Sequence, residues 1–273
     1  MKESMYSILE DQDVLINEKI YDEQNNLVIS IDYSLRPKEE KRFHYNNKNQ
    51  LIREESMIDD RVGDTQEFEY DEEGKINEQR HSIGGALYEK TVVEKVGAVE
   101  TRKTLQDGEE TERVEMEVDG DVKTYRFYDY GELVQVNTVK KEGNTVTTTS
   151  LVVASDQMFT EVQQFNDNGD LIESSDFYGE EAENSKLKRE YEGGNCTKVI
   201  FESFTQPHTN YEEVNTFDEL GNRIGFEKMD YTGRLMRFEK TRYNEDNKQV
   251  EKAGNSGSAK YHFRIDYDKS INA

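Results

Sequence analysis

The sequence predicts an all-β protein in which one antiparallel β-hairpin is repeated along the whole chain. A tyrosine or phenylalanine followed by Asp or Asn, a short polar turn and an aliphatic residue recurs every 24 to 26 residues. A second set of turn residues falls near the middle of each interval. The 16 tyrosines and the many valines and threonines favour strands between these turns. A fixed period of this length indicates one supersecondary unit stacked many times.

The Tyr-Asp repeat can be followed from one end of the chain to the other. The clearest copies are Tyr21–Leu27, Tyr45–Leu51, Tyr70–Ile76, Phe165–Leu171 and Phe217–Ile224, followed by a looser copy at Tyr243–Asn247 and a last one at Tyr267–Asp268. From Tyr21 to Tyr267 there are 246 residues, so ten intervals average 24.6 residues each. Turns at 95–98, 118–122 and 141–144 continue this frame through a middle region that has lost the aromatic residue.

The turns in the middle of each interval divide every period into two strands. They are Asp59–Asp60, Gly84–Gly85, Asp107–Gly108, Tyr130–Gly131, Tyr178–Gly179, Pro207–His208, Thr232–Gly233 and Asn255–Gly257. Gly, Asn and Asp supply the positive φ that tight hairpin turns need. The spacing predicts a meander of about twenty antiparallel strands of about eight residues each. The exceptions are residues 6–10, expected to form a turn of helix, and residues 180–188, expected to be a polar loop or a short helix.

The predicted sheet has one moderately apolar face and one strongly charged face. In 113–119, Val114, Met116 and Val118 alternate with charged residues, as they would on opposite faces of a strand. Hydrophobic residues make up 33% of the chain and charged residues 34%, which is poor material for a thick two-layer core. Open sheets rarely exceed about ten strands without curling. We therefore expect residues 1–273 to form one continuous hairpin-repeat domain, a curled open sheet, half-pipe or shell, with its closure left open.

The charge of the chain bears on its partners. It has 35 Lys and Arg against 59 Asp and Glu, a formal charge of −24. Such a field repels nucleic acid and anionic lipid and attracts a basic protein. The single cysteine, Cys196, excludes an internal disulfide framework. The sequence shows neither a signal peptide nor a membrane-spanning apolar run, so we expect a cytoplasmic protein.

The Tyr-Asp-x-x-Gly pattern with its aliphatic ending resembles the YD (tyrosine-aspartate) repeat of Rhs-type polymorphic-toxin proteins. Phe217–Ile224 and Tyr70–Ile76 are the closest copies, and Asp230–Leu235 has the same Gly-Arg-Leu ending. The resemblance implies strands that spiral into a hollow shell, sometimes around a toxin. This chain is far shorter than a full cage, has only Pro37 and Pro207, and shows no toxin domain after Tyr267. It is more similar to the free-standing YD-like and MORN-like immunity (antitoxin) proteins of such systems.

The sequence offers no convincing catalytic, cofactor or metal site. The four histidines stand apart, and no local signature pairs one with Cys196 as a nucleophile. The turn 166–170 resembles a calcium loop, but its glycine is fourth, as in a hairpin turn, whereas an EF-hand needs glycine in the sixth position. An enzyme acting on carbohydrate would need two carboxylates about 5–10 Å apart in a cleft.

The densest acidic stretch is the candidate partner-binding surface. It contains Asp107, Glu109, Glu110, Glu112, Glu115, Glu117, Asp119 and Asp121, with Arg113 as the only cation. On a strand, Glu115, Glu117 and Asp119 would form a ladder on one face with steps of about 7 Å. The alternative is a solvated charged face. The sequence therefore predicts a non-enzymatic protein-binding module of the immunity type that sequesters a basic partner. The alternative function is a scaffold or shell protein that self-associates through sheet edges.

Overall fold

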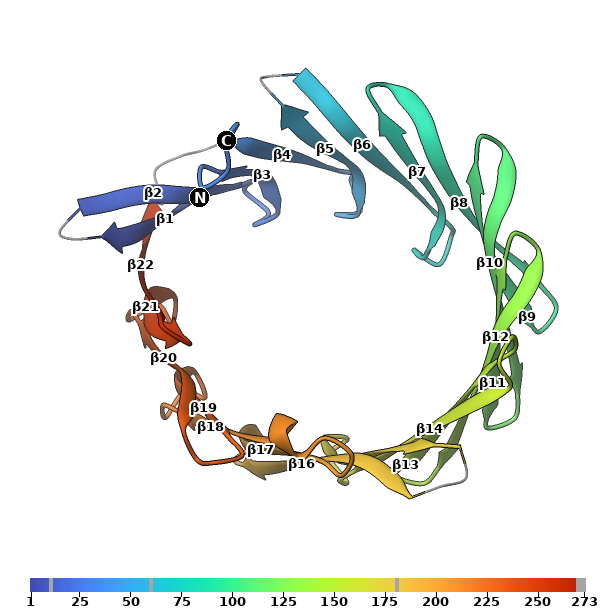
Figure 1. Cartoon of the computed structure of the whole chain (residues 1–273). Helices are drawn as coiled ribbons and strands as arrows, with labels where there is room; N and C mark the ends of the chain where they lie inside the picture. The colour runs from blue at the N-terminus through green and yellow to red at the C-terminus, as the bar shows by residue number, and fades with distance from the viewer. Residues whose placement is uncertain (10–11, 59–60, 180–181, 269–273) are drawn as a thin grey trace.

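The computed structural model describes residues 1–9, 12–58, 61–179 and 182–268, which form a closed barrel of 22 antiparallel strands (Figure 1). The first eleven strands are β1 (Lys2–Leu9), β2 (Gln12–Tyr21), β3 (Leu27–Asp32), β4 (Glu39–Tyr45), β5 (Leu51–Ile58), β6 (Arg61–Tyr70), β7 (Ile76–Ile83), β8 (Ala86–Val96), β9 (Val99–Gln106), β10 (Glu109–Asp119) and β11 (Val122–Asp129). The others are β12 (Glu132–Glu142), β13 (Thr145–Val152), β14 (Gln157–Phe165), β15 (Leu171–Tyr178), β16 (Glu183–Glu192), β17 (Asn195–Ser203), β18 (Tyr211–Phe217), β19 (Arg223–Asp230), β20 (Leu235–Tyr243), β21 (Gln249–Ser256) and β22 (Ala259–Asp268). A 3-10 turn, η1 (Pro207–Thr209), precedes β18.

The expectation of a curled open sheet, half-pipe or shell is wrong, because the two end strands pair with each other. β1 pairs with β2 on one side and with β22 on the other, in a register that runs from Lys2 opposite Asp268 to Ser7 opposite Phe263. Closure removes the two free edges that an open sheet would expose. The predicted all-β hairpin meander is confirmed, including the turns at 97–98, 120–121 and 143–144 in the middle region.

Two local expectations also need correction. Residues 6–9 belong to β1, and β16 begins at Glu183, so neither segment contains the predicted helical turn within the described residues. In both places the neighbouring strands supply hydrogen-bond partners for an extended backbone, which overrides weak local preference. The turn predicted at Asp59–Asp60 and the start of the 180–188 segment lie outside the described residues.

The barrel wall is a single layer without a conventional core. Its accessible surface is 17810 Å², against roughly 12,000 Å² expected for a compact protein of this mass. Met57 and Ile265, 7% and 8% exposed, are the hydrophobic side chains that are buried among the described residues. Stability therefore comes mainly from the sheet's hydrogen bonds and from side-chain pairs across neighbouring strands.

The wall has two faces, and within 113–119 apolar and charged residues alternate between them as predicted. Residues directly opposite each other in the sheet share a face, and following these pairs around the barrel defines both sets. One face, the aromatic face, carries Phe43, Phe68, Tyr125, Phe127, Phe201, Tyr211, Phe226, Tyr261 and Phe263. The other, the ion-pair face, carries contacts such as Arg80 with Glu69 and Lys103 with Glu94.

The hairpin turns form two rims at opposite ends of the barrel. The Tyr-Asp rim consists of turns 22–26, 46–50, 71–75, 97–98, 120–121, 143–144, 166–170, 193–194, 218–222 and 244–248. The described turns of the other end, the far rim, are 33–38, 84–85, 107–108, 130–131, 153–156, 204–210, 231–234 and 257–258. Both rims follow directly from a meander in which every strand reverses the direction of the one before it (Figure 1).

The Asp or Asn of each repeat holds its turn together. The Asp22 carboxylate accepts hydrogen bonds from the backbone N–H groups of Gln24 at 2.9 Å and Asn26 at 2.8 Å. Asp218 does the same for Leu220 and Asn222. The residue three positions after the Asp or Asn has positive φ, as at Gly221 with φ 82°, which explains the glycine or asparagine found there. The Asp or Asn is thus a turn-forming residue.

In four of the described repeats the tyrosine joins one hairpin to the one before it. The hydroxyl of Tyr70 donates to the carbonyl oxygen of Leu51 at 2.7 Å, and Tyr45, Tyr191 and Tyr267 donate in the same way to Leu27, Leu171 and Gln249. The paired register between β5 and β6 ends at Arg53 opposite Glu67, so the strands diverge toward this rim. The phenol bridges that gap. Where the repeat has Phe217, the Asn215 amide donates to the Cys196 carbonyl at 3.0 Å instead.

Removing one such bridge should weaken the barrel measurably. We expect Tyr70→Phe to lower the free energy of unfolding by about 1 kcal/mol, because it leaves the Leu51 carbonyl without its donor. Tyr243→Phe is the matched control, since its hydroxyl lies 3.5 Å from the Arg223 carbonyl. Urea unfolding followed by circular dichroism measures both. Equal losses for the two variants would contradict the bridging role.

Candidate functional site

The eight acidic residues predicted to bind a partner do not form one surface. Asp107, Glu109 and Glu110 lie at the far rim, where β10 begins, whereas Asp119 and Asp121 lie at the Tyr-Asp rim, where it ends. Eleven residues of strand separate these ends, a distance of roughly 35 Å. Glu115 and Glu117 lie between them on the ion-pair face, while Glu112 is on the aromatic face.

The carboxylates in the middle of β10 are compensated by neighbouring groups. Arg126 donates to the Glu117 carboxylate at 3.0 Å, and the Tyr128 hydroxyl donates to Glu115 at 3.0 Å. Arg113 lies 3.4 Å from Glu115 and stacks over the Tyr128 ring at 4.0 Å. The predicted ladder therefore exists, but β11 already supplies the positive charge and hydrogen bonds that an external partner was expected to bring.

Glu112 has a different neighbour. It lies directly opposite Asp129 on β11, so two acidic residues face each other, an arrangement that is destabilising without a cation. No ion pair joins either carboxylate to a Lys or Arg within the described ranges. A recess of about 320 Å³ opens beside them, lined by apolar Val114, Phe127 and Val134 and also by Arg113, Tyr128 and Gln135. Sequence reasoning missed Asp129, and the only signal near it was the Tyr130–Gly131 turn that follows it.

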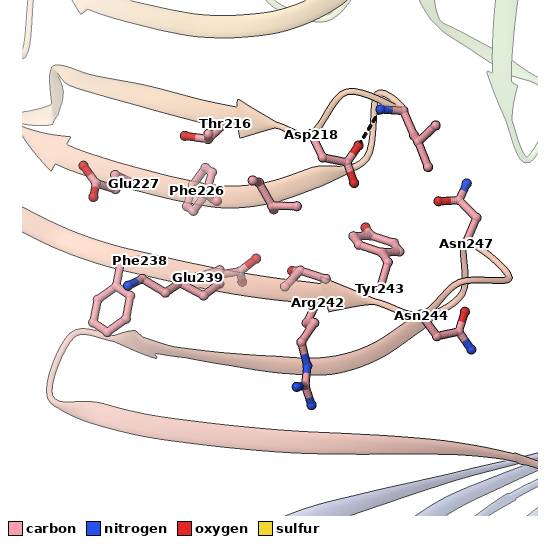
Figure 2. Close-up of a pocket in the computed structure, with 15 residues that line it drawn as sticks. Thr216, Asp218, Phe226, Glu227, Phe238, Glu239, Arg242, Tyr243, Asn244 and Asn247 are labelled. Carbon is pink, nitrogen blue, oxygen red and sulfur yellow. Dashed lines mark hydrogen bonds between the residues drawn. The ribbon is translucent and has the colours of Figure 1, made fainter.

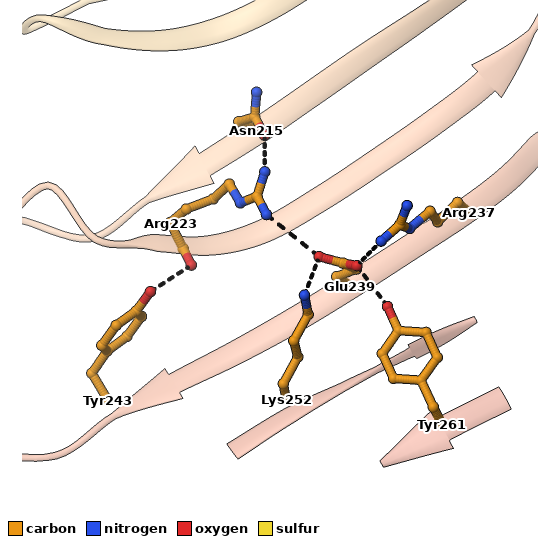
Figure 3. A network of polar contacts seen from close by, with 7 residues as sticks. All are labelled: Asn215, Arg223, Arg237, Glu239, Tyr243, Lys252 and Tyr261. Atoms are coloured by element: carbon orange, nitrogen blue, oxygen red, sulfur yellow. Dashed lines mark hydrogen bonds and ion pairs between the residues drawn. The ribbon is translucent and has the colours of Figure 1, made fainter. Parts of the chain in front are cut away.

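The most buried charged residue among those described is Glu239, which the sequence did not single out. Its side chain is 3% exposed and lies on β20 amid groups from β19, β21 and β22 (Figure 3). Its carboxylate accepts from the Tyr261 hydroxyl at 2.7 Å and from Lys252 at 3.0 Å. The guanidinium groups of Arg237 and Arg223 also contact it. Burial raises the pKa of Glu239, but hydrogen bonds from Tyr261, Lys252 and Arg237 outweigh it and lower the pKa to about 2.

A glycine makes this network possible. Gly254 lies directly opposite both Glu239 and Tyr261. A Cβ at this position would lie 2.7 Å from the Tyr261 hydroxyl oxygen, closer than real Cβ atoms approach such a group. The absence of a side chain lets the tyrosine cross over β21 and reach the carboxylate, a close approach typical of glycine in strands.

A large recess lies beside this network, between β19 and β20. Pairing of the two strands ends at Gly225 opposite Lys240, so they diverge toward the Tyr-Asp rim and leave a wedge of about 700 Å³. Figure 2 shows Phe226 on β19 and Tyr243 on β20 bordering this wedge, with Asn244 and Asn247 at its outer end. Its volume is in the range of small-molecule sites, and its walls can hold an apolar group between aromatic rings.

Other chemistry has little support in the geometry. No group of three or more His, Cys, Asp or Glu side chains with metal-binding geometry occurs in the described ranges. The turn 166–170 is a hairpin turn in which Asn166 accepts from the backbone N–H groups of Asn168 and Asp170. Burial raises the pKa of the Cys196 thiol, which disfavours the thiolate a nucleophile requires. The described part of the chain has no helix with the length and apolarity needed to cross a membrane.

Comparisons with known proteins give structural neighbours but no family. No protein-family model and no curated protein matches the chain. A porin-like protein from Bacteroides uniformis is similar over 98% of this chain and 97% of its own, with 9% identity and a TM-score of 0.37. A TcdB2–TccC3 structure matches 91% of this chain at 11% identity and a TM-score of 0.27, and the Photorhabdus luminescens Tc holotoxin pore matches 93% at 8% and 0.22. This chain spans only 15% and 19% of those two toxin chains. TM-scores this low carry no argument about function.

Proposed function

We propose that the barrel is a non-enzymatic protein-binding module of the immunity type, which sequesters a basic partner, in the cytoplasm, through acidic groups at its rims. The observation that carries this proposal is the contrast between wall and rims. Glu115 and Glu117 in the wall are compensated by their neighbours. Asp107, Glu109 and Asp121, at the rims, are exposed and have no cationic partner among the described residues.

Two further features support binding over catalysis. The rigid, continuously paired wall presents fixed charges, and fixed complementary charge steers a partner of opposite sign and raises the rate of association. The YD-type repeat in the sequence suggests a toxin domain as the partner. A scaffold that self-associates through free sheet edges has less support, because β1 and β22 pair with each other and neither leaves such an edge.

The product of the neighbouring gene is the partner to test, by calorimetric titration at low and high salt. We expect tight binding that weakens by about tenfold or more as salt screens the charges. Charge reversal of the exposed pair, Asp107→Lys with Glu109→Lys, should weaken binding more than reversal of the compensated pair, Glu115→Lys with Glu117→Lys. No binding, or binding that does not respond to salt, would refute the proposal.

A further inference from the structure

Exposed apolar side chains are distributed very unevenly between the two ends of the barrel. Among the described residues, twenty-two large hydrophobic side chains are between 36% and 79% exposed. Five of them, Ile52, Ile76, Val96, Val118 and Leu220, lie at or near the Tyr-Asp rim. The other 17 lie in the far-rim turns or within three strand residues of them. The exposed apolar side chains therefore gather at the far rim, whose turns differ in length and sequence from those of the Tyr-Asp rim.

Part of the far rim combines these apolar groups with unpaired acids. This part, the docking arc, runs from the end of β9 to the end of β15. Its exposed apolar side chains are Tyr130, Leu133, Val134, Val153, Phe159 and Tyr178. The Tyr178 ring packs edge-on against the Phe159 ring, with 5.1 Å between the ring centroids. The same arc has exposed carboxylates at Asp107 and Glu109, at its β9–β10 end, and at Asp129, Glu132 and Asp156, among the apolar side chains. The sequence has no lysine or arginine in 104–112, 127–134 or 150–159.

We propose that the docking arc is the surface through which the barrel binds its basic partner. A lysine or arginine of that partner enters the recess beside Glu112 and Asp129. Apolar side chains of the partner cover Tyr130 in the rim turn and, over the edge of the wall on the ion-pair face, Leu133. This inference rests on the proposed function for the partner's charge. Arg113 also lines the recess but is paired with Glu115, so the facing carboxylates of Glu112 and Asp129 leave a negative charge that favours a cation. The apolar lining residues, Val114, Phe127 and Val134, suit the stem of a long basic side chain.

The size of the docking arc fits a single protein interface. Neighbouring strands lie about 4.8 Å apart, so the arc is roughly 30 Å long. Its six apolar side chains expose between 36% and 73% of their surface, or roughly 500 Å² in all. A standard interface buries about 800 Å² on each partner, of which somewhat more than half is apolar. The match in area and the enrichment in tyrosine favour a protein over a small ligand.

A short amphipathic peptide with leucine and arginine on one helical face serves as a probe that does not require the natural partner. We expect fluorescence anisotropy to show binding to the wild-type barrel. The double variant Tyr130→Asn with Leu133→Thr should weaken it by about tenfold. The control variant Val96→Thr with Leu220→Gln, at the Tyr-Asp rim, should leave it unchanged. A peptide with every leucine replaced by serine should bind at least about tenfold more weakly.

Tyr130 allows loss of binding to be separated from loss of folding. It has φ 44°, whereas the other five non-glycine residues with positive φ in the described part of the chain are Asn or Asp. Asparagine tolerates this conformation better, so Tyr130→Asn should keep or raise the melting temperature while binding falls.

Absence of probe binding, equal losses in both double variants, or equal affinity for the serine peptide would overturn the docking arc. If the neighbouring gene product binds the Tyr130→Asn, Leu133→Thr variant as tightly as wild type, the docking arc fails and the proposed function stands. If the probe binds the arc and that product does not bind at all, the proposed function fails alone.

Discussion

Replacing Glu239 by glutamine should lower the free energy of unfolding by about 3 kcal/mol near neutral pH. Glutamine keeps the shape of the side chain but not the charge that holds Arg223, Arg237 and Lys252 together. Those three cations then lie close together beside a neutral amide. Both arginine side chains are 46% exposed and can turn toward water, which places the expected cost at the lower end of the range for broken buried pairs.

The pKa of Glu239 gives this prediction a pH dependence. Its folded-state value of about 2 lies below the ordinary 4.5, so the ionised group stabilises the fold above about pH 4.5 and this contribution is lost as the pH falls toward 2. The difference in unfolding free energy between wild type and Glu239→Gln should therefore shrink from about 3 kcal/mol near pH 7 to about 1.5 kcal/mol at pH 3. Urea unfolding across this range measures it.

A control on the same face separates the network from an ordinary ion pair. Glu213 contacts Lys228 alone, at 2.9 Å, with 24% of its side chain exposed. Glu213→Gln should cost less than about 1 kcal/mol. If the two variants lose similar stability, or if the loss in Glu239→Gln does not depend on pH, the four-donor network is not what holds this part of the barrel.

The features that sequence reasoning found are those that local chemistry decides. The turn 22–26 is formed by Asp22 and a residue of positive φ three positions later, so a short motif is enough to predict it. The strand that places Val114, Met116 and Val118 on one face can be recognised within seven residues. The acidic stretch 107–121 could also be recognised in the sequence, but its residues do not form one surface, because β10 runs from one rim to the other and its two ends lie far apart. The partners of Glu117 could not be inferred, since Arg126 comes from the next strand.

Features that depend on several strands at once could not be predicted from the sequence. The groups around Glu239 come from four strands, and Arg237 is the only one of them near it in the chain. Closure of the barrel depends on even more of the chain, because it requires the twist and stagger between neighbouring strands to add up correctly over all 22 strands. A small change per strand would leave the ends apart. The same repeat is therefore compatible with an open sheet, and only the pairing of β1 with β22 distinguishes the two.

This distinction leads to the second large expected effect: Asp266→Pro should cost at least about 3 kcal/mol, as proline does within a sheet. Asp266 lies opposite Ser4 across the seam. Met1 and Tyr21 exchange both backbone hydrogen bonds between β1 and β2, so the alternation along β1 makes Ser4 and Asp266 a hydrogen-bonded pair.

Thr148→Pro is the reference, because Thr148 is paired on both sides, with Val139 and Glu161. In a closed barrel the two variants lose similar stability, since every strand is interior. In an open sheet β22 would be an edge strand, where proline is tolerated, and Asp266→Pro would cost far less than Thr148→Pro.

A covalent link across the seam tests closure without damaging it. Met5→Cys with Ile265→Cys, in a Cys196→Ser background, places two thiols on directly opposed residues. Opposed residues in antiparallel strands lie about 4.5–5.5 Å apart at Cα, within the range a disulfide spans. We expect the oxidised protein to run faster than the reduced protein in denaturing electrophoresis and to unfold at higher urea. The disulfide shortens the accessible unfolded chain, which accounts for the second effect. Oxidation would show that β1 and β22 meet in solution, because only the closed barrel brings residues 5 and 265 together. Failure to oxidise while the chain is folded would contradict the closed barrel.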